Sequence, residues 1–263
     1  MISSNDSVEI GGIAVYNHGT IINSSFEMPS TINSELEHTG LYSSTSSASH
    51  SAIVGGIVVY NGSSRDEISG IISESNFNGD ISGNMIGGIA YESYGNIEKC
   101  YSNGNAYIAS NDGRAIEYGG IVGRLFGKSA IKYSYSQLIV NALVTSATSG
   151  SVGGIVGNYD TNSLKANPST VIGCYAVLDV TFSVTNSSVN VYAVMPGNEK
   201  VTCEDNVVYS KVTFTLNSGA SANVVTDITA LNNAVANVKE NGISVYKTDN
   251  KDGEGNSDYP TFA

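Results

Sequence analysis

The composition of this 263-residue chain favours strands and tight turns, and the chain is long enough to bury a core without disulfide bonds. Only 14% of its residues are charged, tryptophan is absent, and tyrosine outnumbers phenylalanine sixteen to six. The net charge of −12 at pH 7 argues against nucleic acid as a partner, because binding to phosphates needs clustered Lys and Arg. No apolar run reaches the length of about 18 residues that a membrane-spanning helix needs, so no membrane span is expected.

An imperfect repeat opened by Gly-Gly-Ile runs along most of the chain. The glycine pairs begin 44, 32, 32 and 34 residues apart, at Gly11, Gly55, Gly87, Gly119 and Gly153. A second block with a small residue in its fourth position follows each pair, at residues 22–26, 72–76, 97–101, 131–135 and 171–175. A looser β-branched run closes the unit, as at 106–109, 138–144 and 180–184. We therefore predict three short strands per repeat.

A sixth, degenerate copy without the glycine pair spans residues 191–194, 207–210 and 212–216. Three strands of about five residues cannot bury an apolar face alone, but copies stacked about 4.8 Å apart form a continuous core. The sequence thus predicts an all-β fold over residues 1–225, a right-handed parallel β-helix or solenoid of about six three-stranded rungs. The glycine pair is expected at a corner or crowded interior. A β-propeller ranks second, because a blade normally needs about 40 residues.

Residues 226–263 are predicted to form a C-terminal cap. Apolar residues recur there at helical spacing, at Ile228, Leu231, Val235 and Val238. This pattern predicts a short amphipathic capping helix with Thr226 or Asp227 as its N-cap. A strand at 243–246 and a polar tail would complete a lid over the open strand edges at that end of the stack.

Two sets of repeat positions predict columns of side chains. The small residues of the second blocks are expected to face inward, and they are Ser25, Ser75, Cys100, Ser134 and Cys174. Cys100 and Cys174 would then be core fillers two rungs apart, beyond the reach of a disulfide bond. Tyrosines form the other columns, Tyr16 with Tyr60 and, in the second blocks, Tyr101 with Tyr135 and Tyr175. Such columns can either pack inward or offer a platform for sugars or peptides.

The motifs resemble those of the GLUG-motif repeat family. Gly-Gly-Ile-Val-Gly occurs at 119–123 and 153–157, and an Ile-x-x-Cys-Tyr-Ser block occurs at 97–102. Leu231-Asn232 and Tyr259-Pro260 match the usual ending of that family. The first three repeats depart from the motif, with Val15, Val59 and Tyr91 at its last glycine. The resemblance implies a bacterial, extracellular or cell-surface location in a larger anchored protein, and it carries no catalytic residue.

Catalytic signatures are absent from the sequence, and the histidines show no regular ligand spacing. One weak calcium candidate lies in the tail, where oxygen ligands alternate at Asp252, Glu254, Asn256 and Asp258. No cofactor is otherwise expected. Loops inserted into the second and fifth repeats are better candidates for ligand binding, because binding residues often sit on loops of rigid scaffolds. Their candidate residues are Arg65, Asp66, Glu67, Tyr159 and Asp160.

These patterns predict a non-enzymatic module of a bacterial surface protein, adhesin-like or a rigid stalk, that presents loops to a host protein or a glycan. Two alternatives stay open. A carbohydrate-active enzyme on a β-helix would need paired carboxylates with a nearby cation. A self-assembling fibre component would use open strand edges.

Overall fold

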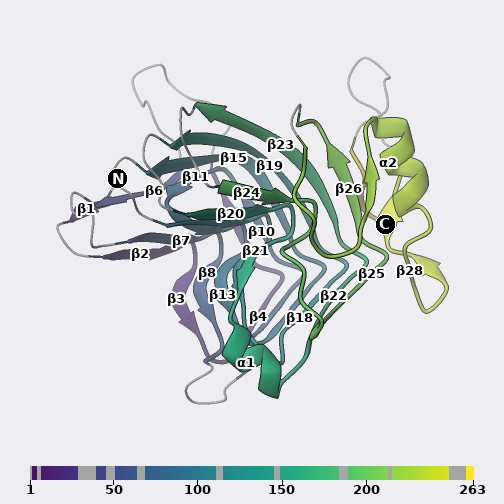
Figure 1. Cartoon of the computed structure of the whole chain (residues 1–263). Helices are drawn as coiled ribbons and strands as arrows, with labels where there is room; N and C mark the ends of the chain where they lie inside the picture. The colour runs from purple at the N-terminus through teal and green to yellow at the C-terminus, as the bar shows by residue number, and fades with distance from the viewer. Residues whose placement is uncertain are drawn as a thin grey trace.

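The fold is nearly all-β and is dominated by four parallel sheets (Figure 1). The structure is a computed structural model that describes residues 2–4, 7–28, 40–45, 51–63, 69–110, 115–144, 149–183, 189–212, 215–248 and 259–263. Two short helices, α1 (Thr161–Ala166) and α2 (Ile228–Val235), accompany the sheets. No helix in these ranges is long and apolar enough to cross a membrane.

Each of the four sheets is built from equivalent strands of successive repeats. The first sheet contains β2 (Val8–Gly11), β7 (Ala52–Gly55), β12 (Met85–Gly87), β16 (Ile116–Gly119), β20 (Gly150–Gly153) and β24 (Val189–Tyr192). The second contains β3 (Ala14–Asn17), β8 (Val58–Asn61), β13 (Ala90–Ser93), β17 (Val122–Leu125) and β21 (Val156–Tyr159). The third contains β4 (Thr20–Ile22), β9 (Ile71–Ser73), β14 (Asn96–Glu98), β18 (Ala130–Lys132), β22 (Ser169–Ile172) and β25 (Val201–Glu204).

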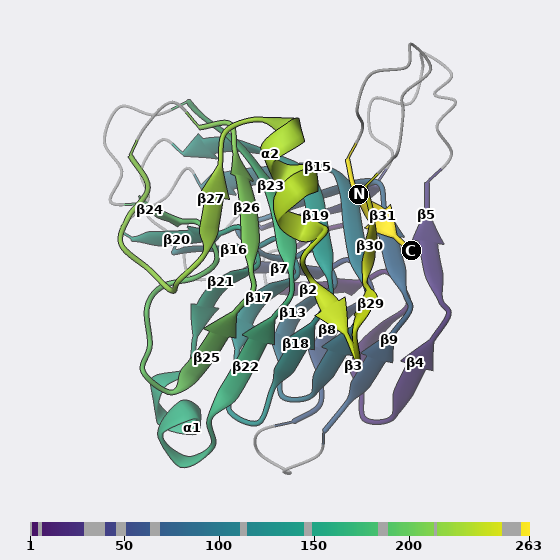
Figure 2. The same ribbon diagram turned by 90° about the vertical axis from the view of Figure 1, so that its right-hand side faces the viewer.

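The fourth sheet has the longest strands. It runs through β1 (Ile2–Ser4), β6 (Gly40–Thr45), β11 (Asp80–Gly83), β15 (Tyr101–Ser110), β19 (Tyr135–Val144), β23 (Tyr175–Ser183), β26 (Val207–Ser210) and β27 (Asn223–Val225), and β5 (Ser25–Glu27) and β10 (Asn76–Asn78) extend it. Figure 2 shows the strands of these sheets following one another in chain order across the molecule, from β4 and β5 on one side to β25 and β27 on the other.

Equivalent residues of successive repeats pair in register. Gly87 lies opposite Gly55 on one side and Gly119 on the other, and Ile97 lies opposite Ile72 and Ile131. The repeat seen in the sequence is therefore the unit of strand pairing, as predicted.

The third, fourth and fifth repeats contribute four strands each, and the first two contribute five, rather than the three predicted. The Gly-Gly-Ile sequence is a bend between two strands, so that β12 ends at Gly87 and β13 starts at Ala90. By contrast, one continuous strand contains the end of the second block together with the third block, as in β15 from Tyr101 to Ser110. The prediction placed a strand where the chain bends and a break where it continues.

Close backbone approach explains the glycine pair. A Cβ atom added to Gly88 would lie 2.0 Å from the carbonyl oxygen of Gly120, and one added to Gly56 would lie 2.0 Å from that of Gly88. The first glycine of the pair is equally crowded, since a Cβ on Gly87 would lie 1.7 Å from the carbonyl oxygen of Ala90. No side chain fits at this bend, which confirms the prediction of a crowded corner.

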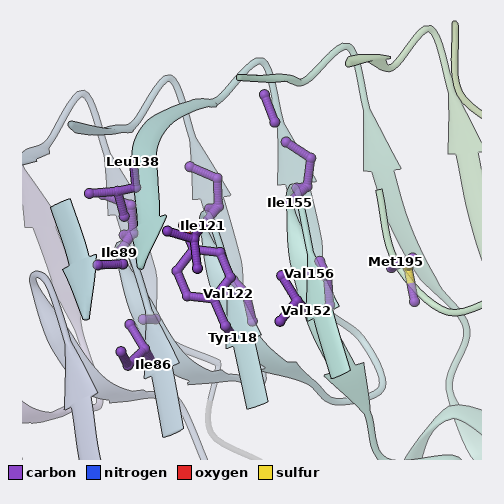
Figure 3. Close-up of a cluster of buried hydrophobic side chains, with 14 of the residues drawn as sticks. Ile86, Ile89, Tyr118, Ile121, Val122, Leu138, Val152, Ile155, Val156 and Met195 are labelled. Carbon is purple, nitrogen blue, oxygen red and sulfur yellow. The ribbon is translucent and has the colours of Figure 1, made fainter. Parts of the chain in front are cut away.

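The isoleucine after each glycine pair begins the main core. Ile57, Ile89, Ile121 and Ile155 are fully buried in one column, and side chains of the first and fourth sheets pack against them (Figure 3). Ile13, in the first repeat, is 45% exposed because a neighbouring repeat covers it on one side alone. Burial of the column comes from the stacking of repeats, as in other repeat proteins.

A column of small residues lies at the bend between the third and fourth sheets. Ser75, Cys100, Ser134 and Cys174 are buried there, as predicted, but the first repeat contributes Ser24 rather than Ser25. The prediction began the block of the first repeat at Ile22, whereas Ile21 pairs with Ile72 and so holds its first position. The buried Asn206 holds the equivalent position in the sixth repeat. The residue before each member of the column has positive φ, and these residues are Asn23, Glu74, Lys99, Tyr133, Gly173 and Asp205.

The C-terminal segment covers an outer sheet face instead of closing the strand edges. Helix α2 begins after its N-cap Asp227, as predicted, and buries Leu231 and Val235. Two antiparallel pairs follow, β28 (Lys239–Glu240) with β29 (Ile243–Ser244) and β30 (Tyr246–Lys247) with β31 (Thr261–Phe262). Their apolar side chains join those of α2 in a second core against the fourth sheet. Figures 1 and 2 show α2 lying beside β26 on the outside of this sheet, while Val224 of the edge strand β27 stays 45% exposed.

Candidate functional site

Of the residues predicted for ligand binding, the structure describes Tyr159 and Asp160, and both have structural partners. Tyr159 ends β21, and its hydroxyl donates to the carbonyl oxygen of Gly197 at 3.2 Å. Asp160 is the N-cap of α1 and accepts a hydrogen bond from the backbone N–H of Ser163 at 2.7 Å. The loop inserted in the fifth repeat thus folds into a capped helix. The other candidates, Arg65, Asp66 and Glu67 and the calcium candidates Asp252, Glu254, Asn256 and Asp258, lie outside the described residues.

A polar cluster lies where the outer faces of the first and second sheets meet. We call it the polar seam, and it consists of Glu9, Tyr60, Tyr91, Glu92, Glu117, Arg124 and Asn158. Glu9 and Glu117 come from the first sheet and the others from the second, so the two sheets contribute together. The glycine bend joins a strand of the first sheet to the next strand of the second, as β7 to β8 in Figure 1.

Glu117 is the most buried charged group of the polar seam, with only 6% of its side chain exposed. Its neighbours in β16, Ile116 and Tyr118, point into the main core, so alternation along the strand directs Glu117 to the opposite face. The carboxylate accepts hydrogen bonds from the Tyr91 hydroxyl at 2.7 Å and from Asn158 Nδ2 at 2.9 Å, and it forms an ion pair with Arg124. Three donors therefore hold the buried charge in place.

Tyr91 reaches Glu117 because the next repeat has a glycine at the equivalent position. A Cβ atom on Gly123 would lie 2.4 Å from Cδ2 of Tyr91, so the ring occupies space that a side chain there would fill. Burial raises the pKa of Tyr91 well above its ordinary value, and the nearby Glu117 charge raises it further. The hydroxyl thus remains a hydrogen-bond donor.

Glu92 is the carboxylate of the polar seam that accepts no hydrogen bond from the described residues. It lies opposite Arg124 in the register of β13 and β17, and opposite Tyr60 in β8. Burial raises the pKa of Glu92 to about 7; the Arg124 charge lowers it and the Glu117 charge raises it. Among the described residues, none donates a hydrogen bond to this carboxylate, and the buried Nε of Arg124 has no hydrogen-bond partner either. The Glu92 carboxylate can therefore accept a hydrogen bond from a polar group outside the chain, with the partly exposed Arg124 side chain beside it.

A short aromatic ladder continues the polar seam toward the N-terminal repeat. The rings of Tyr16 and Tyr60 stack with centroids 4.9 Å apart, and Tyr16 is 60% exposed. The Tyr60 hydroxyl donates to Glu9 at 2.7 Å, which fixes the ring. Because Tyr16, Tyr60, Glu92, Arg124 and Asn158 are register partners, they form one outward row along the second sheet.

The second tyrosine column is not a free platform. Tyr101, Tyr135 and Tyr175 stack with centroids 5.0 and 4.8 Å apart on the outer face of the fourth sheet. Tyr246 and Phe262 of the C-terminal segment cover Tyr135, and Tyr246 also covers Tyr175. This column faces outward, yet it is packed, a combination that neither of the two predictions included.

The cysteines are free, and two of them are buried in the main core. Burial raises the pKa of the Cys100 and Cys174 thiols to about 12 and that of Cys203 to about 11. These thiols carry little thiolate at neutral pH, so they are poor nucleophiles. Within the described ranges, no group of three His, Cys, Asp or Glu residues could hold a metal ion.

Sequence reasoning missed the polar seam because its residues meet across two sheets. Asn158, which reaches Glu117, is 41 residues away in the chain. One signal was present, namely the bulky Tyr91 at a position where later repeats have glycine. The sequence does not show that Tyr91 reaches Glu117, because the two residues lie on different sheets.

Comparisons with known proteins support the fold alone. No family model matches the sequence, and no curated protein matches it. The chain is similar to a crystal structure described as a "putative immunoglobulin A1 protease" from Bacteroides ovatus, with a TM-score of 0.55 and 19% sequence identity. The superposition covers 98% of this chain and 74% of the other.

Proposed function

We propose that this chain is a rigid, non-enzymatic module of a bacterial surface protein, adhesin-like in its role, that presents an outer sheet face to a host protein or a glycan. The resemblance to the GLUG-motif repeat family supports the extracellular location, and the bacterial source of the similar structure is in keeping with it. The role as a scaffold rests on strand pairing that repeats in register through all four sheets.

The proposal includes the path of the chain, a right-handed β-solenoid in which each full rung spans the four sheets. Each full repeat visits the four sheets in the same order, which supports a solenoid. Crossovers between parallel strands are right-handed in nearly all proteins, which supports the hand. A stack of this kind is stiff because each strand inside a sheet pairs with neighbours on both sides.

The observation that carries the binding role is the outward row on the second sheet. Tyr16 and Tyr60 offer stacked aromatic rings, and Glu92 and Arg124 offer a carboxylate and a guanidinium in the same row. Aromatic rings beside polar groups bind ligands that have both apolar and hydrogen-bonding surfaces. A sugar has such surfaces, because its ring has an apolar face and hydroxyls at its edge.

Binding to a glycan array with a Tyr16→Ala, Tyr60→Ala double variant tests this role. We expect the wild-type chain to bind a subset of glycans and the double variant to lose at least about tenfold in affinity, since an anchoring aromatic contributes roughly 2 kcal/mol. Tyr107→Ala is the matched control, because Tyr107 is an exposed tyrosine on the fourth sheet.

Three results contradict the binding role. These are the absence of any ligand on the array and among host surface proteins, equal losses in the double variant and in Tyr107→Ala, and unchanged binding in both. The first of these would leave the chain as a spacer.

A second candidate function is a carbohydrate-active enzyme, and the environment of Glu92 favours it. A carboxyl group with a pKa near 7 is suited to general acid catalysis, and Arg124 supplies the nearby cation. Against it, the other carboxylate of the polar seam, Glu117, already accepts from three donors. Release of reducing ends from polysaccharides by the wild-type chain, with loss of activity in Glu92→Gln, would establish the enzyme; no release from any tested polysaccharide would exclude it for those substrates.

A further inference from the structure

A cavity of about 560 Å³ opens between the fourth sheet and the C-terminal segment. Its walls come from the bend before β15 and from the pairs β28–β29 and β30–β31, which are far apart in the sequence. Its size falls in the range of about 300 to 1,000 Å³ that is usual for small-molecule and side-chain sites. It lies on a different sheet from the polar seam and shares no residue with it.

The cavity has an apolar floor. Tyr101, Val245 and Phe262 line it, and Val245 is only 7% exposed. The Tyr101 ring is held by stacking on Tyr135 and lies 6.4 Å from the Phe262 ring between centroids. Ile243 also lines the cavity and is 73% exposed, the highest value among the exposed large apolar side chains of the described residues. An apolar ligand group that buries the Ile243 side chain would gain binding free energy from the hydrophobic effect.

The rim of the cavity is acidic. Lys99 and Glu240 form an ion pair of 2.8 Å across it, which neutralises the one cation that lines the cavity within the described part of the chain. Glu74 also lines the cavity, and its carboxylate has no hydrogen bond or ion pair with the residues the structure describes. Two carboxylates, Glu74 and Glu240, and one cation, Lys99, line the cavity, so the rim is negative overall among the described residues.

We propose that this cavity binds an arginine side chain, flanked by an apolar residue, from a protein partner. The guanidinium would pair with the Glu74 carboxylate, and the apolar neighbour would pack against Phe262 and Ile243. Arginine suits the site better than lysine because its planar, weakly hydrated head also stacks on aromatic rings such as that of Tyr101. The net charge of −12 attracts such a basic partner.

Isothermal titration calorimetry with two capped dipeptides tests the proposal. The probes are acetyl-Phe-Arg-amide and acetyl-Phe-citrulline-amide, because citrulline is a neutral isostere of arginine. We expect saturable binding of the arginine peptide to the full chain, and binding of the citrulline peptide that is about threefold to tenfold weaker, the range for a partly exposed charge pair. No saturable binding of the arginine peptide, or equal affinity for the two peptides, overturns the proposal.

Variants then locate the site. Glu74→Gln should weaken the arginine peptide about threefold to tenfold and leave the citrulline peptide unchanged, while Ile243→Ala should weaken both. Asp205→Asn is the matched control, because Asp205 has the same left-handed backbone conformation at the equivalent bend but does not line this cavity. Equal effects of Glu74→Gln and Asp205→Asn would show that the peptide responds only to net charge, which also overturns the proposal. Because Tyr16 and Tyr60 lie on another sheet, failure here leaves the glycan test unaffected.

Discussion

The α-carbon of Gly88 lies so close to Gly120 of the next repeat that a Cβ atom on Gly88 would stand 2.0 Å from the carbonyl oxygen of Gly120. This backbone contact recurs at every glycine pair that has a following repeat. Substitutions at this bend should therefore be among the most damaging in the chain.

We expect Gly88→Ala to destabilise the fold by about 3 kcal/mol or more, because the backbone of two repeats must separate to admit the methyl group. Gly19→Ala is the control, since a Cβ atom there meets nothing within 4 Å. Its effect should stay within about 1 kcal/mol. Urea unfolding followed by circular dichroism measures both, and similar stabilities for the two variants would contradict the role given to this contact.

A serine should replace the buried Cys174 at little cost. In the same column, the Ser134 hydroxyl accepts from the backbone N–H of Cys100 at 3.1 Å and donates to the carbonyl oxygen of Lys132 at 2.9 Å. The Cys174 sulfur accepts a hydrogen bond from the Ser134 backbone and donates to the carbonyl oxygen of Ile172 at 3.5 Å. A serine hydroxyl at this position would therefore have both a donor and an acceptor. We expect Cys174→Ser to cost less than about 1 kcal/mol.

The control for this substitution is Val171→Ser, at a fully buried position in the main core. It should cost about 3 kcal/mol, because the hydroxyl is buried and a cavity is left. Thermal unfolding of the two variants distinguishes a column built for small polar groups from a general tolerance of serine. Equal losses would refute the special character of the column.

Glu92 should make the stability depend on pH. Its pKa is raised from 4.5 to about 7 in the folded chain, so the folded state binds a proton more tightly than the unfolded state does. Its contribution therefore favours folding below about pH 4.5 and is lost as the pH rises through 7. Glu92→Gln should stabilise the chain by about 1 to 3 kcal/mol at pH 8 and have little effect at pH 4.5.

The comparison with Glu204→Gln controls for the loss of one charge, since Glu204 is an exposed carboxylate on the third sheet. Unfolding curves at several pH values should differ between wild type and Glu92→Gln and coincide in shape for wild type and Glu204→Gln. A destabilising effect of Glu92→Gln at pH 8 would mean that the folded state prefers the ionised carboxylate.

Tyr246 fastens the C-terminal segment to the tyrosine column. Its ring meets Tyr175 edge to face at 5.1 Å, and its hydroxyl donates to the carbonyl oxygen of Gly173 at 2.8 Å. We expect Tyr246→Phe to cost about 1 to 2 kcal/mol through the lost hydrogen bond and Tyr246→Ala about 3 to 5 kcal/mol. In hydrogen exchange, Tyr246→Ala should deprotect α2 while the first and second sheets stay protected; uniform deprotection would instead mean that the segment and the sheets unfold as one unit.

The sequence predicted the repeat and the reason for its glycines, because a steric requirement of the backbone leaves the same residue at the same place in each copy. It did not predict the number of strands, since Gly-Gly-Ile is apolar enough to look like a strand, although Gly88 and Ile89 form a bend. Helix α2 was predictable from local spacing and from the N-cap Asp227. The surface that it covers was not, because Tyr135 and Tyr246 are far apart in the chain and meet only in the folded structure.

The contacts of the polar seam were also not predictable from the sequence. Glu117 and Arg124 are seven residues apart, but a bend separates them and their side chains meet across two sheets. Predicting this contact requires the direction of the bend, which no single residue encodes. The shifted pKa of Glu92 arises from burial by the two sheets together and was equally inaccessible.

The residues of positive φ at the bend between the third and fourth sheets differ in charge and size while sharing one backbone conformation. They are Asn23, Glu74, Lys99, Tyr133, Gly173 and Asp205. The bend requires this backbone conformation but no particular side chain. The side chain can therefore change in one repeat without disturbing the neighbouring repeats. The bend therefore offers one variable side-chain position per repeat, at which substitutions can change what the surface binds while the backbone stays the same.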